Sequence, residues 1–107
     1  MDRERLKGHL DLLLLAVLED EPAHGYVVIT RLRERSDGGF DLPEGTIYPA
    51  LHRLERAGLL VSDWVEHAGR RRRAYALTAA GHRELAAERA SWTRFARGVI
   101  AVTGATA

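Results

Sequence analysis

Cysteine is absent from this chain, and that absence excludes a disulfide scaffold, a thiolate metal site and a cysteine nucleophile. Glycine-rich phosphate loops are missing too, and none of the three serines lies in the context of a catalytic nucleophile. The sequence therefore predicts a protein that is not an enzyme and needs no cofactor.

Long apolar runs and a cleavable leader are also missing. No window approaches the roughly 18 apolar residues of a membrane span. The first residues, MDRERLKGHLDLLLL, carry mixed charge and contain no small-residue cleavage site, which argues against a signal peptide. We therefore expect a cytoplasmic protein without a membrane partner.

Lysine is scarce, whereas arginine is plentiful and unevenly placed. Of the 16 basic residues, Lys7 is the only lysine. Residues 1–50 carry 6 basic and 10 acidic side chains, whereas residues 51–107 carry 10 basic and 5 acidic ones. A basic half in a chain of ordinary globular composition indicates an anionic partner for one face.

The hydrophobic spacing predicts one small domain that is mostly α with a small β-hairpin. Apolar residues at three- and four-residue spacing predict three helices, and a short alternating pattern after Gly58 predicts a hairpin. Thr78 can cap a last helix. The expected elements are helices over about 5–19, 24–36 and 44–57, strand 60–66, basic turn 67–73, strand 74–77 and helix 79–102.

This α-α-α-β-β-α order is typical of a winged helix-turn-helix. We expect residues 1–78 to form the DNA-binding domain and residues 79–107 to form a dimerisation helix with a short tail. If Ile47, Leu51 and Leu54 face the core, the opposite side of the third helix is short, polar and basic. That outward side carries Gly45, Thr46, Pro49, His52, Arg53 and Arg56, with Tyr48 on its flank.

Arg53 and Arg56 could reach guanine edges or phosphates of double-stranded DNA, and Thr46 could touch a base or a phosphate. Pairing of Arg53 or Arg56 with Glu55 or another surface acid is the alternative. The run from Arg70 to Arg73 is expected at the tip of the hairpin, where guanidinium groups suit phosphates and narrow minor grooves. A merely solvated turn is the alternative there.

Several short stretches and single residues carry a family resemblance, and they are HGY at 24–26, Phe40, EGTIYPALHRLERAGLL at 44–60, Trp64 and RRRRAYALTAAG at 70–81. Through these residues the sequence resembles the PadR family of bacterial winged-helix regulators. Ala74 departs from the second tyrosine that many relatives carry beside Tyr75. The resemblance implies a homodimeric repressor of the small subfamily that binds a palindromic operator. The predicted DNA-binding residues are Thr46, Tyr48, Pro49, His52, Arg53, Arg56, Arg70, Arg71, Arg72, Arg73 and Tyr75.

The last helix independently indicates a homodimer. Leu85, Trp92 and Val99 repeat every seven residues, a short heptad-like seam. Packing of this helix onto the first helix of the same chain is the alternative. Two-fold symmetry would place the two third helices roughly 34 Å apart, about one DNA turn. The predicted interface comprises Leu10, Leu14, Leu85, Trp92, Phe95, Val99 and Val102.

Three further hypotheses concern what the protein responds to and binds. In multidrug-binding PadR regulators a similarly placed tryptophan stacks on planar compounds, so the resemblance implies an aromatic effector at Trp92 and Phe95. A plain interface tryptophan is the alternative. Asp63 and His67 are weak candidates for a divalent-metal site in a metal-responsive repressor. A winged-helix module that binds protein instead of DNA is the third reading, and the arginine run argues against it.

Overall fold

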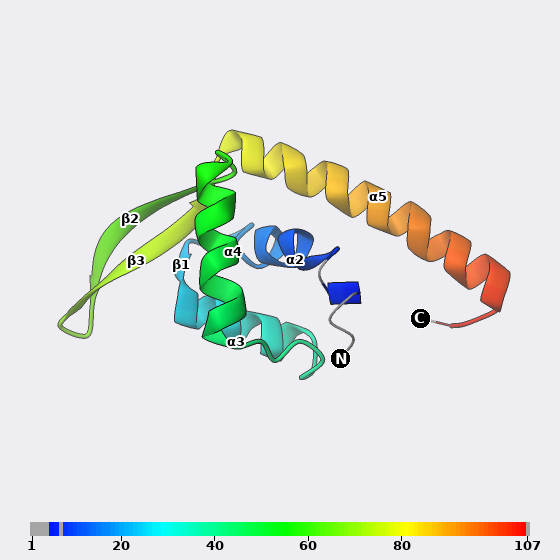
Figure 1. Ribbon diagram of the computed structural model, residues 1–107, viewed down its shortest axis with the longest axis horizontal. Helices are drawn as coiled ribbons and strands as arrows, with labels where there is room; N and C mark the ends of the chain where they lie inside the picture. The colour runs from blue at the N-terminus through cyan, green and yellow to red at the C-terminus, as the bar shows by residue number, and fades with distance from the viewer. Residues whose placement is uncertain (1–4, 7, 107) are drawn as a thin grey trace.

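The protein, seen here in a computed structural model that describes residues 5–6 and 8–106, combines a helical body with a projecting hairpin and a projecting helix (Figure 1). The hairpin and the long terminal helix extend to opposite sides of the body. The elements are α2 (Leu10–Val17), β1 (Ala23–His24), α3 (Gly25–Arg35), α4 (Glu44–Arg56), β2 (Leu60–His67), β3 (Arg70–Leu77) and α5 (Ala79–Thr103).

The core lies where α2, α3 and α4 meet. Each helix contributes leucine, valine or isoleucine at three- and four-residue spacing, so one stripe of each is apolar. Leu14, Val28, Ile47 and Leu51 are completely buried there. The sequence predicted that the first helix would end at about residue 19, whereas α2 ends at Val17.

Helices α3 and α4 form the predicted helix-turn-helix. The ring of Tyr48 lies directly over Gly25 at the start of α3, and a Cβ on Gly25 would come 2.4 Å from the Tyr48 ring. Only glycine therefore lets the two helices approach this closely. In the connection, the Ser36 hydroxyl donates to the carbonyl of Leu32 (2.6 Å) and accepts from the N–H of Phe40 (2.9 Å).

Helix α4 begins at Glu44, as predicted, with Pro43 at its N-cap. Pro49 lies inside the helix and has no N–H, so the carbonyl of Gly45 lacks its usual intrahelical donor. Gly45 is exposed, so water can replace the donor. The helix ends before Gly58, which has a φ of 80°. Glycine adopts this left-handed conformation without strain because it has no Cβ.

The hairpin differs from the prediction of a basic turn over residues 67–73. Strands β2 and β3 pair over eight residues each, and the turn is only Ala68–Gly69, with φ values of 52° and 77°. Two central residues with positive φ match the tight turn that suits the twist of a β-hairpin. Arg70–Arg73 therefore lie in a strand, which tolerates them because successive side chains point to opposite faces. The short β1, which the sequence reading missed, pairs with the other edge of β3.

Helix α5 is anchored at its first turns and leaves the body after them (Figure 1). The Thr78 hydroxyl accepts from the N–H of Gly81 (3.0 Å), which confirms the predicted cap. A Cβ on Gly81 would lie 2.1 Å from the carbonyl oxygen of Leu59, so glycine is needed at this junction. Arg89 and Glu19 form an ion pair (2.9 Å) between α5 and the end of α2. Within the described residues no helix is both long and apolar enough to cross a membrane.

Candidate nucleic-acid interface

The outward face of α4 is polar and basic, as the sequence predicted. Gly45, Pro49, His52 and Arg56 are exposed on it. Thr46 and Tyr48 are half-buried at its edges, and Tyr48 uses its ring to pack on α3. The helix thus presents the imidazole of His52 and the guanidinium of Arg56. Gly45 and Pro49 beside them are small, so a ligand can approach the helix closely.

Arg53 belongs to the same helix, but its guanidinium is already engaged. Its Nη2 donates to Oδ1 of Asp11 (2.6 Å) and its Nη1 donates to Oδ2 (3.0 Å), which joins α4 to the first turn of α2. This hydrogen bond raises the pKa of Arg53 above its ordinary value. Arg53 is therefore a predicted DNA contact on α4 that already has a partner inside the chain.

The four arginines of β3 fall into two sets. Arg71 and Arg73 share a strand face with Trp64, and their guanidinium carbons lie 5.1 and 5.2 Å from its ring centroid. Arg70 and Arg72 lie on the opposite face of β3, because successive side chains of a strand alternate between its two faces. Trp64 is 53% exposed, so its ring holds the two cations at the surface of the hairpin instead of in the core.

Arg73 also fastens the hairpin to α4. Its Nε donates to Oγ of Ser62 (2.6 Å), and the Ser62 hydroxyl donates in turn to Oε2 of Glu55 (2.5 Å). Nη2 of Arg73 lies 3.9 Å from the same carboxylate oxygen. This chain of contacts fixes the base of the β2–β3 hairpin, called the wing below, relative to α4.

A small cleft of about 260 Å³ joins the two basic elements. It lies where the first turn of α3, the outward face of α4 and the inner part of the wing meet. Nε of Arg72 is enclosed near there and has no hydrogen-bond partner among the described residues. The cleft is lined by His24, Gly25, Tyr48, His52, Trp64, Arg71, Arg72, Arg73 and Tyr75.

Tyr75 requires a correction, because it was predicted to contact DNA. Only 1% of its surface is exposed, and it belongs to the hydrophobic core. Burial is the main cause of the raised pKa of its hydroxyl, and the charge of Glu55 adds to it. Tyr75 supports the base of the wing and offers almost no accessible surface for a contact with DNA.

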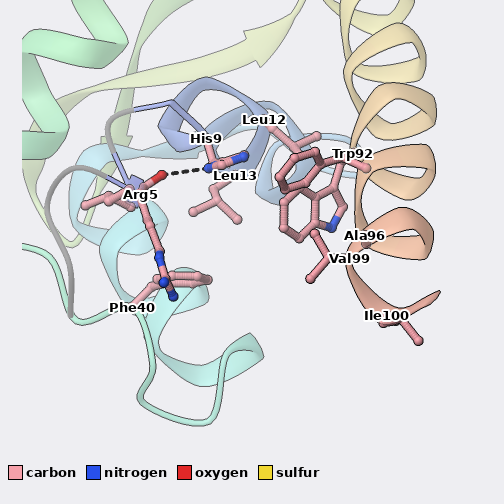
Figure 2. Close-up of a pocket in the computed structure, with 11 residues that line it drawn as sticks. Arg5, His9, Leu12, Leu13, Phe40, Trp92, Ala96, Val99 and Ile100 are labelled. Atoms are coloured by element: carbon pink, nitrogen blue, oxygen red, sulfur yellow. Dashed lines mark hydrogen bonds between the residues drawn. The ribbon is translucent and has the colours of Figure 1, made fainter. Parts of the chain in front are cut away.

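A second concave surface lies on the other side of the molecule, between α5 and the start of α2 (Figure 2). It encloses about 900 Å³. The ring centroids of His9 and Trp92 lie 4.8 Å apart in a T-shaped arrangement, and the ring centroids of Trp92 and Phe95 lie 5.9 Å apart. Nδ1 of His9 donates to the carbonyl of Arg5 (2.6 Å). The groove is lined by Arg5, Leu6, His9, Leu12, Leu13, Phe40, Trp92, Phe95, Ala96, Val99 and Ile100.

The predicted interface residues separate into core and surface. Leu14 and Leu85 are fully buried within one chain, so the structure corrects their assignment to the dimer surface. Leu10 is half-buried against the same core. The large apolar side chains that remain exposed on α5 are Trp92, Phe95, Val99, Ile100 and Val102.

Several groove residues escaped the sequence reading. Ile100 lies one position beyond the heptad pattern that singled out Val99. Phe40, Leu12 and Leu13 reach the groove from a loop and from α2, and no pattern local to α5 could have found them. The apolar pattern along the whole length of α2 and α5 was the only signal that could have indicated the groove residues on these two helices.

The metal hypothesis gains no support from the described geometry. Oδ1 of Asp63 accepts from the backbone N–H of Trp64 (3.0 Å). The side chain of His67 lies outside the described residues. Among the residues that the structure describes, no three His, Cys, Asp or Glu side chains are grouped to hold an ion.

The Arg73 contacts generate a stability prediction. Arg73→Ala removes its hydrogen bond to Ser62 and the cation beside Glu55, so we expect the free energy of unfolding to fall by about 1 kcal/mol. Arg70→Ala is the matched control and should change it by less than about 0.5 kcal/mol. Urea unfolding at one fixed protein concentration measures both. Equal stability of the two variants would contradict the fastening role.

Comparisons with known proteins agree with this geometry. The family described as "Transcriptional regulator PadR-like family" matches residues 14–87. Transcriptional regulator Rv3488 of Mycobacterium tuberculosis is 38% identical over 98 residues, which cover 92% of this chain and 89% of the relative.

Solved structures resemble the whole chain. A PadR family regulator from Clostridium difficile superposes with a TM-score of 0.78 at 34% identity, covering 92% of this chain and 100% of that one. A PadR-like regulator from Bacillus cereus gives a TM-score of 0.84 at 26% identity, covering 96% and 99%. The winged helix-turn-helix with its basic face, the family match and these relatives agree: the chain is a member of the PadR-like family, which consists of transcriptional regulators and not of enzymes.

Proposed function

We propose that this protein is a dimeric repressor that binds a palindromic operator in double-stranded DNA through α4 and the wing. The observation that carries the proposal is the shared cleft, because it brings His52 of α4 and three arginines of β3 to one side of the molecule. Residues 1–78 would form the DNA-binding unit and residues 79–107 the dimerisation element. Binding to chromosomal DNA would place the protein in the cytoplasm.

The two basic elements suit different parts of DNA. A helix fits the major groove, where the exposed Arg56 and His52 can meet base edges. Arginines on a hairpin suit phosphates and the minor groove, where they add affinity but little sequence information. Arg70 and Arg71 are the exposed pair nearest the tip of the wing. We therefore assign specificity to α4 and general affinity to the wing.

This division predicts two kinds of mutant. Arg70→Ala with Arg71→Ala should weaken binding to operator and random DNA alike, and flatten the slope of log affinity against log salt by up to about 0.9 per lost phosphate contact. Arg56→Ala should weaken operator binding by roughly 1–3 kcal/mol more than random binding. Fluorescence anisotropy with both DNAs at several salt concentrations measures this. An unchanged salt slope in the wing variant would show that its arginines are only solvated.

The second copy is expected to cover the free part of α5 and to border the groove. Trp92 is 43% and Phe95 62% exposed, although aromatic side chains normally bury most of their area. Contiguous apolar surface of this kind marks an interaction site. A second copy of α5 carries the same apolar stripe, so a two-fold pairing covers both stripes at once.

A charge placed in the stripe should separate the subunits. Val99→Glu puts a carboxylate among Trp92, Ala96 and Ile100, where dimerisation would bury it against apolar side chains, so we expect a monomer at micromolar concentration. Ala101→Glu is the matched control, because two residues along a helix turn it about 200° away. Sedimentation velocity distinguishes the two. A Val99→Glu variant that stays as dimeric as the wild type would contradict this interface.

We further propose that the groove takes a planar aromatic effector. Its volume of about 900 Å³ lies within the range of small-molecule sites, and its walls are aromatic and aliphatic with few polar groups. Trp92 offers a ring face for stacking. The effector would release DNA only if it binds the free arrangement of the dimer more tightly than the DNA-bound arrangement.

Tryptophan fluorescence tests this effector site. Planar phenolic or cationic aromatic compounds should quench Trp92, while Trp64, the only other tryptophan, remains as background. The same compounds should weaken DNA binding by an amount of about 1–3 kcal/mol, so release would be partial. Quenching that is equally strong in Trp92→Leu would move the ligand site elsewhere.

A further inference from the structure

The ion pair between Asp11 and Arg53 connects two elements that have different roles. Asp11 lies in the first turn of α2, and Arg53 lies in the last turn of the recognition helix α4. The pair is bidentate, with distances of 2.6 and 3.0 Å from the two terminal nitrogens of Arg53 to the two carboxylate oxygens. Residues 42 positions apart in sequence are thus joined at the surface.

The contact uses the part of Arg53 that DNA would also need. The two terminal nitrogens form the fork with which arginine binds a guanine edge or a phosphate bidentately. While the Asp11 carboxylate occupies that fork, a second acceptor cannot bind the same two nitrogens end-on. End-on binding of Asp11 and end-on binding of DNA therefore exclude each other.

The position of the pair permits such an exchange. The Arg53 side chain is 51% exposed and the Asp11 side chain 43%, so neither group must leave a buried site. Arg53 lies one helical turn from Pro49 and next to His52 in sequence, at the edge of the outward face of α4. An exposed pair of this kind contributes little to folding, so breaking it is not expensive.

The carboxylate of Asp11 favours the internal position of Arg53. Its hydrogen bond is the main cause of the raised pKa of Arg53, and its charge adds to that rise. DNA phosphates must compete with this carboxylate for the same guanidinium.

We propose that Asp11 is an affinity-determining residue of the DNA-binding site, because it competes inside the chain for the guanidinium of Arg53. The proposal rests on the proposed function, since it assumes that α4 approaches DNA. Arg53 leaves Asp11 when operator DNA arrives, and the cost of breaking the pair lowers the affinity. Asp11 is directly followed by Leu12 and Leu13, which line the groove, so the groove adjoins this competitor.

Substitution of Asp11 tests the proposal. Asp11→Asn keeps the size of the side chain but releases Arg53, so operator binding should tighten about two- to fivefold. If Arg53 then binds a phosphate, the salt dependence should steepen by up to about 0.9. Asp20→Asn is the matched control, because it removes the same charge from the exposed turn after α2 and leaves Arg53 paired. Anisotropy titrations with operator DNA measure all variants.

A double-variant cycle identifies the cause. In an Arg53→Gln background, Asp11→Asn should tighten binding no more than Asp20→Asn does, because no guanidinium remains to be released. A gain that persists in this background, or an Asp11→Asn affinity equal to or weaker than that of Asp20→Asn, would overturn the proposal. If the wild type binds no DNA at all, the proposed function fails first and this inference with it.

Discussion

Burial of one side of α4 is the constraint on which the remaining arrangement depends. Ile47, Leu51 and Leu54 are almost completely enclosed by α2 and α3, and each buried side chain contributes roughly 1.5–3 kcal/mol. Because this stripe faces inward, the opposite stripe must face solvent. The close approach at Gly25 and Tyr48 then sets how α4 crosses α3. The basic surface follows from the packing beneath it.

Arginine has several roles in this chain. Arg31 donates to the carbonyls of Val17 and Glu21, and so holds α3 against the end of α2. Arg73 ties the wing to α4 through Ser62. These arginines act inside the fold, because a planar guanidinium can satisfy several acceptors at once. The exposed Arg56, Arg70 and Arg71 remain for an external anion. A count of basic residues therefore overstates the surface that can bind DNA.

The two ends of the molecule leave apolar side chains exposed in different surroundings. At the wing, two cations of the same chain lie over the Trp64 ring, which stays 53% exposed. At the far part of α5, aromatic and aliphatic side chains have only partial cover from His9 and the start of α2. Glu19 and Arg89 hold α5 in this position. The proposed DNA interface and the proposed subunit interface thus lie on opposite sides of one small core (Figure 1).

The sequence by itself determined what depends on neighbours along the chain. Helical spacing predicted α3, α4 and α5 nearly to their ends, and Thr78 capped α5 as expected, because periodicity and caps are local. Only the tertiary structure decided which side chains are left at the surface. It buried Tyr75, Leu14 and Leu85, extended Arg70–Arg73 into a strand, and paired Arg53 with Asp11. Those outcomes depend on contacts between residues distant in sequence, and no local pattern records such contacts.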